Sequence, residues 1–204
     1  MLLYHRGQDN QAAGIIGWPT GGDSAEIRES RQLEILTQLF QNRLLDKLRE
    51  KLGESYSPQV VNSWPIELNG GGNVFALANL QPKSVPVFFL TAEEIANDLS
   101  ANPVSAEELG RVTEPLKQSL TRASSSSAFF MYLIEGATAE PTRYRSVRTL
   151  LSDYTETTPA AMQALARKYF APGKSWRVAV IPQGQTLARM PVPASIAAPA
   201  AAGH

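Results

Sequence analysis

The longest regular stretch of the sequence runs up to Gly53, and its apolar residues recur every three or four positions, at Leu33, Leu36, Phe40, Leu44 and Leu48. This spacing predicts an amphipathic helix with one face turned toward a core. Asp23, followed three residues later by Glu26, resembles a capping box and predicts where the helix begins. Gly53 predicts where it ends, because glycine reaches the left-handed conformation without a Cβ penalty.

Further segments with helical spacing follow downstream. Helix starts are predicted at Pro86, at Ser105 with Glu108 as a second capping box, and at Thr158-Pro159. Two more helices are predicted in "AFFMYLIEGA", after the serines at 124–127, and in the segment that ends at Tyr154. Pro115 lies inside one of these helices and predicts a kink or an irregular turn. The predicted inward positions are Phe88, Ala92, Ile95 and Leu99. The apolar positions with helical spacing in the later helices are Leu109, Val112, Leu116, Leu120, Val147, Leu150, Leu151, Tyr154, Met162, Leu165, Ala166 and Tyr169.

Strand patterns lie at both ends of the sequence and around one hairpin. The predicted strands are 2–5, 11–18, 55–64, 73–80 and 175–182, with "LNGGG" at 68–72 as the hairpin turn. This order of strands and helices predicts an α+β fold, a two-layer sandwich of a mostly antiparallel sheet with helices packed on one side. We expect one domain over residues 1–183 and a disordered, Ala/Pro-rich tail over 184–204.

The composition excludes several classes of protein. Nineteen basic and nineteen acidic residues balance, so we expect neither nucleic acid nor a membrane as a partner. No cysteine is present, which excludes disulfides, thiol catalysis and Cys-ligated zinc. The first residues run directly into strand-like sequence, so we expect a longer parent chain whose targeting signal lies upstream.

A search for catalytic motifs finds no complete active site. Histidine occurs only as His5 and His204, and no H-x-x-E-H spacing exists. The "GGG" at 70–72 is not followed by Lys-Ser or Lys-Thr, which a phosphate-binding loop requires. The acidic pairs at 93–94 and 107–108 are interpreted as solvated first turns of helices, because adjacent helical residues diverge by about 100°.

The segment "RLLDKLREKLGESYSP", residues 43–58, contains the candidate site. On one interpretation, Arg49 neutralises a helix C-terminus and Tyr56 is a half-buried strand aromatic. On the other, Arg49 and Tyr56 project toward a common cleft, where a cation and a phenol bind a peptide carbonyl or a developing oxyanion.

This segment resembles the signature of the zinc-free, C-terminal-type domains of the insulinase/pitrilysin zinc metallopeptidases, a family that includes mitochondrial processing peptidase. The matching residues are Leu48, Arg49, Glu50, Lys51, Gly53, Tyr56 and Ser57. Residues 5–20 and 166–183 are similar to the opening and closing segments of the bacterial members. The resemblance covers roughly residues 2–183.

The resemblance implies a metallopeptidase-like half domain and a split active site. Zinc and the general base would come from H-x-x-E-H on a separate N-terminal-type domain, on the same chain or on another subunit. Arg49 and Tyr56 would contact the peptide substrate, and this chain would hold no metal. A periplasmic location is implied, with a cytoplasmic one left open. The alternative function is a catalytically inactive scaffold or assembly subunit of the same fold.

Overall fold

The computed structural model describes residues 1–53, 57–135, 138 and 141–187. Its strands are β1 (Leu2–His5), β2 (Ala12–Pro19), β3 (Gln59–Ser63), β4 (Asn73–Leu80) and β5 (Trp176–Pro182). Its α-helices are α1 (Ile27–Leu52), α2 (Val85–Ala101), α3 (Ala106–Ala123), α4 (Ser127–Ile134), α5 (Pro141–Thr155) and α6 (Pro159–Tyr169), and a short 3-10 helix, η1 (Pro82–Ser84), precedes α2. No helix among these residues is long and apolar enough to cross a bilayer.

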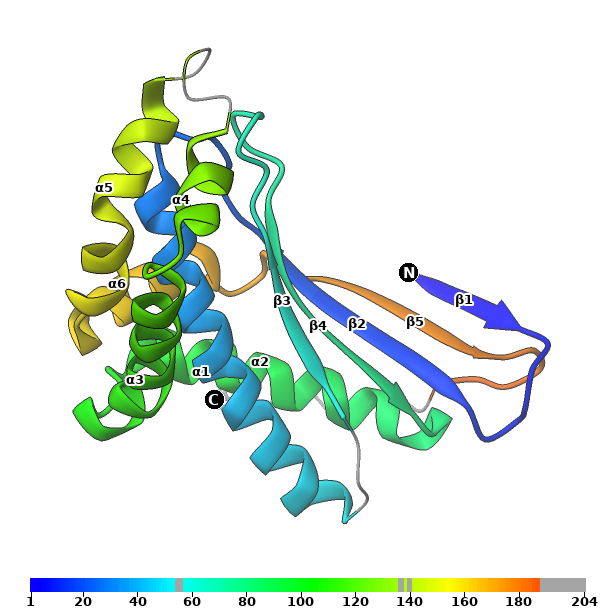
Figure 1. Ribbon diagram of the computed structural model, residues 1–204. Coiled ribbons are helices and arrows are strands. Elements are labelled where there is room, and N and C mark those ends of the chain that lie inside the picture. Colours follow the sequence, from blue (N-terminus) through cyan, green and yellow to red (C-terminus); the bar gives the residue numbers. More distant parts are fainter. Residues whose placement is uncertain (54–56, 136–137, 139–140, 188–204) are drawn as a thin grey trace, which may run out of the picture.

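The five strands form one sheet in the order β1-β5-β2-β4-β3. β1 runs parallel to β5, whereas all the other neighbouring strands are antiparallel. Figure 1 shows the helices gathered on one side of the sheet, with α1 and α2 nearest to it. The predicted α+β sandwich of a mostly antiparallel sheet is therefore confirmed. Of the strand predicted at 55–64, residues 55 and 56 lie outside the described residues, and the described part forms β3 over Gln59–Ser63.

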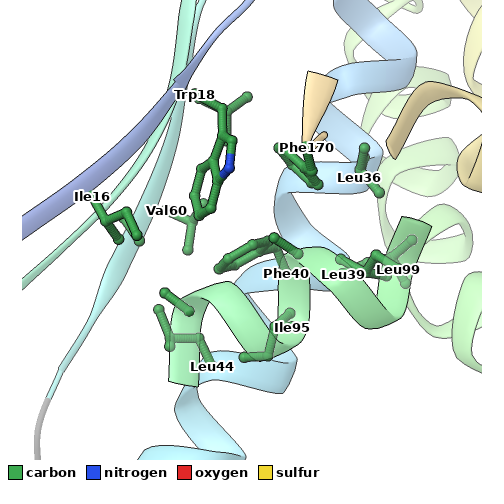
Figure 2. Close-up of a cluster of buried hydrophobic side chains, with 14 of the residues drawn as sticks. Ile16, Trp18, Leu36, Leu39, Phe40, Leu44, Val60, Ile95, Leu99 and Phe170 are labelled. Atoms are coloured by element: carbon green, nitrogen blue, oxygen red, sulfur yellow. The ribbon is translucent and has the colours of Figure 1, made fainter. Parts of the chain in front are cut away.

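The core lies between the sheet and the first two long helices. Alternate residues of β2 point inward, and Trp18 is packed against Phe40 of α1 and Phe170, with ring centroids 5.6 and 5.1 Å away. Figure 2 shows these three aromatic side chains meeting between β2 and the helices. The predicted stripe of α1 is confirmed, since every member is buried: Leu33, Leu36, Phe40, Leu44 and Leu48.

The predicted helix ends at Gly53, Ser105 and Thr158 are confirmed, whereas the one at Asp23 is wrong. Gly53 adopts φ 62° and caps α1, and the Ser105 hydroxyl accepts a hydrogen bond from the Glu108 N–H at 3.0 Å. Asp23 does not cap α1, which begins at Ile27 with Glu26 as its N-cap. The Asp23 carboxylate accepts from the Ala25 N–H at 3.0 Å instead, in a tight turn where Asp23 itself has φ 93°. Pro115 lies within α3.

Two glycine-containing loops cross next to the sheet, and they approach too closely for side chains. The Thr20 N–H donates to the Gly72 carbonyl at 2.7 Å, and the Gly72 N–H donates to the Gly21 carbonyl at 2.9 Å. A Cβ on Gly72 would lie 2.2 Å from the Gly21 oxygen, a distance that no backbone tolerates without shifting. The turn predicted at 68–72 is therefore also the place where the β3–β4 connection is fastened to the β2–α1 loop.

Ion pairs between helices hold the second layer together, and none of them is evident from local sequence. Arg43 of α1 donates to both oxygens of Glu108 at 2.7 and 2.8 Å, and to Asp98 at 2.6 Å, which joins α1, α2 and α3. Its pKa is raised above the ordinary arginine value, mainly by the hydrogen bond to Glu108. Arg31 of α1 is paired with the buried Asp153 of α5 at 2.7 Å.

The acidic pair predicted to be a solvated first turn at 93–94 lies instead in the middle of α2. Glu93 is bonded to Arg177 of β5, and Glu94 is paired with Lys51 of α1 at 2.6 Å. Leu151 lies in the helix predicted to end at Tyr154, and its side chain is 50% exposed. Beyond β5, Leu187 packs against the core. Residues 188–204 lie outside the described part, so the disordered tail stays a prediction.

Tyr154 of α5 donates a hydrogen bond to the Glu34 carboxylate at 2.5 Å. Burial is the main cause that raises the pKa of this phenol, and the hydrogen bond adds to it. Because the folded-state pKa exceeds that of the unfolded chain, the stabilisation is fully present below about pH 10 and is lost as the pH rises above it. We expect Tyr154→Phe to lower the free energy of unfolding at pH 8 by about 1.5–3 kcal/mol and to flatten its fall above pH 10.

Urea unfolding between pH 8 and 11 measures this effect. The matched control is Tyr144→Phe, because Tyr144 lies on the same helix and is 60% exposed. It should leave both the free energy and its alkaline slope as in the wild type. Burial also raises the pKa of Tyr169. Part of the loss of stability at alkaline pH should therefore remain in every variant. Equal slopes for Tyr154→Phe and wild type would contradict the assignment.

Candidate functional site

The last turn of α1 presents Arg49 to solvent. Leu48, one residue earlier, is only 1% exposed and anchors the helix end in the core. Arg49 itself is exposed, and its carbonyl accepts the Gly53 N–H at 3.1 Å. The sequence folds this way because the apolar stripe ends at Leu48 and the glycine then reverses the chain. The guanidinium therefore extends from a fixed backbone.

An ion pair connects the end of α1 to α2. The Lys51 ammonium lies 2.6 Å from the Glu94 carboxylate, and Leu52 packs against the core. Arg49 and Lys51 both lie in the last turn, where their positive charges oppose the partial negative charge of the helix C-terminus. Because Lys51 is paired with Glu94, Arg49 is the cation of this turn that suits an acceptor such as a peptide carbonyl oxygen.

The chain after this helix returns to the sheet at a defined place. The Gln41 side-chain amide donates to the Pro58 carbonyl at 2.7 Å and accepts from the Val60 N–H at 2.6 Å. The connection between Gly53 and Pro58 is thus fixed at both of its ends. Tyr56 lies within this connection and outside the described residues, so its meeting with Arg49 stays a prediction.

Other candidate chemistry is accounted for by local contacts. Both ring nitrogens of His5 are engaged, because Nδ1 accepts from the Gly7 N–H at 2.9 Å and Nε2 lies 2.8 Å from the Gln11 carbonyl. The ring closes the β1–β2 loop, and it is not available as a ligand or base. Within the described residues, no three His, Asp or Glu side chains converge to hold a metal ion.

A shallow groove between α1 and β3 was not predicted from the sequence. Its lining is mostly polar on the helix side and includes the Glu34 carboxylate that accepts from Tyr154. The full lining is Ser30, Glu34, Thr37, Gln38, Val60, Val61, Asn62 and Trp64. The polar residues of α1 at 30, 34, 37 and 38 recur at helical spacing, which is the signal that could have located it. Arg49 is not part of this groove.

No protein-family model matches the chain, and no curated protein matches its sequence. Solved structures share the fold at low sequence identity. The inactive domain of an M16 peptidase from Pseudomonas fluorescens has a TM-score of 0.69 at 15% identity, and the match covers 93% of this chain and 45% of that one. The periplasmic protease PqqL from Escherichia coli has a TM-score of 0.71 at 13% identity, covering 90% of this chain and 20% of that one.

A candidate zinc protease from Bordetella pertussis gives a TM-score of 0.67 at 16% identity, covering 86% of this chain and 95% of that one. The chain spans less than half the length of the PqqL and Pseudomonas proteins. At these identities the comparisons concern architecture. The chain has the fold of M16 peptidase domains, the fold of the insulinase-type metallopeptidases.

Proposed function

We propose that this chain is the zinc-free, substrate-binding domain of an insulinase-type zinc metalloendopeptidase. The observation that carries the proposal is the motif "LREKLGESYS" at the C-terminus of α1, in a fold that M16 peptidase domains share. The helix end is charged and exposed, and its backbone is fixed by Gly53 and by the Lys51–Glu94 ion pair. These features suit a residue that reaches across a cleft toward a substrate held on another domain.

The part of the chain that the structure describes offers no set of zinc ligands. Among the described residues no ligand cluster is present, and both nitrogens of His5 bond to the loop that follows it. In the proposal, zinc would be bound by H-x-x-E-H on a companion domain, where it would activate a water and polarise the scissile carbonyl. The companion domain lies on the same polypeptide or on a separate subunit.

In this proposal, Arg49 donates charge-assisted hydrogen bonds to a substrate carbonyl or to the oxyanion that develops from it. Tyr56 donates a second hydrogen bond from the connection that follows Gly53. Because the donors and the metal lie on different domains, catalysis requires the domains to close on the peptide. Closure also excludes bulk water, which strengthens each of these electrostatic contacts.

Kinetics of the reconstituted peptidase test these roles. With the zinc-bearing companion present, Arg49→Ala is expected to lower kcat for peptide cleavage about 10²–10³-fold, the usual loss for one oxyanion donor. Tyr56→Phe should lower kcat in the same direction. The matched control is Lys47→Ala, which removes a cation from the same helix and should leave kcat unchanged. Wild-type kcat in both Arg49→Ala and Tyr56→Phe would refute the assigned roles.

A catalytically inactive scaffold of the same fold is the second candidate. One observation favours it: a chain of Complex III2, an assembly from Candida albicans, shares the fold with a TM-score of 0.67 at 12% identity. The two functions differ in the companion polypeptide. A companion without H-x-x-E-H, together with no peptide hydrolysis by the assembled protein, would establish the scaffold role.

The proposed location is the periplasm. The supporting observations are the absence of cysteine from the chain and the similarity in fold to a periplasmic protease.

A further inference from the structure

α4 is an apolar helix that buries none of its side chains. Its sequence, "SAFFMYLI", has six large apolar or aromatic residues among eight. Four of them are well exposed and define the α4 patch: Phe130 at 41%, Met131 at 70%, Tyr132 at 76% and Ile134 at 44%. Consecutive exposed apolar residues on a short helix are uncommon on a monomer surface and mark an interaction site.

Exposed arginines lie on the helices before and after α4. Arg122 in the last turn of α3 and Arg145 and Arg148 on α5 are all exposed. α5 packs beside α4, as Figure 1 shows. From position 117 to position 152 the sequence has five basic and two acidic residues, whereas the whole chain has no net charge. The sequence next to α4 is therefore locally basic, although α3 to α5 as a whole carry six basic and six acidic residues.

This combination of residues is typical of the centre of a protein–protein interface. Phenylalanine, tyrosine, methionine and arginine are the residue types enriched there, and lysine and glutamate are depleted. Exposed aromatic side chains that become buried on binding usually account for most of the binding energy. The α4 patch thus favours a protein partner, whose surface would provide an apolar centre.

The charge pattern argues against a second copy of this chain as that partner. In a two-fold symmetric dimer the same patch meets itself. Arg145 and Arg148 would then lie near their own equivalents, and like charges brought together across an interface oppose association. The complementary surface must instead carry acidic residues around its apolar centre.

We infer that the α4 patch is the docking surface for the companion domain, on which it meets an apolar area rimmed by Asp and Glu. The inference rests on the proposed function, because the companion is the zinc-bearing domain named there. The lengths of two proteins with the same fold support the inference, because this chain matches only 45% of one and 20% of the other. Those proteins therefore contain further chain beside the shared unit.

Titration calorimetry with the purified companion domain tests the role of the apolar side chains of the α4 patch. We expect Phe130→Ser/Met131→Ser to raise Kd about 100-fold or more, as loss of two central contacts does. The midpoint of thermal unfolding should not change, because neither side chain is buried. The matched control is Leu68→Ser, which removes a 63% exposed leucine from the β3–β4 connection and should leave Kd unchanged.

Reversing the charge of the arginines on α5 tests whether they contribute to docking. For the wild type, raising the salt concentration should slow association, because opposite charges steer the encounter. In Arg145→Glu/Arg148→Glu, Kd should rise about 10-fold or more and added salt should instead speed association. The matched control is Lys83→Glu, an exposed cation next to α2, which should retain the wild-type salt dependence.

The outcomes separate this inference from the proposed function. If neither double variant changes Kd while Arg49→Ala still lowers kcat, the docking surface is wrong and the proposed function stands. If the variants change only self-association or binding to phosphatidylglycerol vesicles, the inference is also overturned. If the wild-type domains neither associate nor cleave peptide together, the proposed function fails and the inference fails with it.

Discussion

Replacing Arg31 with methionine is expected to lower the free energy of unfolding by about 3–5 kcal/mol, the usual effect of removing one partner of a buried ion pair. Arg31 and Asp153 have side chains only 9% and 1% exposed, and their charged atoms lie 2.7 Å apart. Without the guanidinium, the Asp153 carboxylate would remain in the interior with only the Thr149 hydroxyl, 2.9 Å away, as a donor. Its Oδ1 atom already has no hydrogen-bond partner among the described residues.

The double variant Arg31→Met/Asp153→Leu separates the attraction between the two charges from the cost of burying the Asp153 carboxylate. Because no buried carboxylate remains, we expect the double variant to be at least 2 kcal/mol more stable than Arg31→Met alone, roughly the desolvation penalty that is removed. Urea denaturation of the two single variants, the double variant and the wild type completes the cycle. Strictly additive losses would show that Arg31 and Asp153 act independently, against the geometry.

Truncation of Phe40 to alanine is expected to cost about 3–5 kcal/mol of unfolding free energy, through lost apolar burial and the cavity that remains. Phe40 is fully buried, and its ring contacts both Trp18 and Phe170 with centroids 5.6 Å away. It is therefore the residue of α1 that joins the sheet to the chain after α6. The aromatic contacts add to the loss because their edge and tilted geometries are favourable.

Two variants control for this measurement in urea denaturation. Phe40→Leu retains most of the volume and should cost less than Phe40→Ala. Phe130→Ala removes the same side chain from α4, where it is 41% exposed, and should change stability by no more than about 0.5 kcal/mol. A loss below about 1 kcal/mol in Phe40→Ala would mean that the aromatic cluster is not the centre of the core.

Features that depend on neighbouring residues were predictable from the sequence. The stripe of α1 follows from helical periodicity, and the caps at Gly53 and Ser105 follow from the conformation or side chain of one residue. The sheet and its layer of helices follow from the order of these elements. The position of Arg49 at an exposed helix end was predictable for the same reason, since it is set by the stripe and the glycine.

Features that depend on tertiary contacts were not predictable. Arg31 and Asp153 are 122 residues apart, and nothing in either segment indicates the other. Asp23 and Glu26 have the spacing of a capping box, but a local turn at Asp23 uses the carboxylate first. Leu151 fits the helical pattern of α5, yet its side chain is exposed, because α5 is turned so that Asp153 and Tyr154 face α1. At Arg31 and in α5 a contact between distant segments overrides the local pattern, whereas at Asp23 one local turn competes with another.

The sheet ends on one side at β3, and there the Gln41 amide occupies the Pro58 carbonyl and the Val60 N–H. A single side chain thus imitates the backbone of an additional strand, and this stretch of the border cannot serve as a template for another chain. β1, at the opposite border, has no comparable cover among the described residues, and its leucines are 39% and 40% exposed. Growth of the sheet, whether with a binding partner or in self-assembly, would therefore be directional and would begin beside β1.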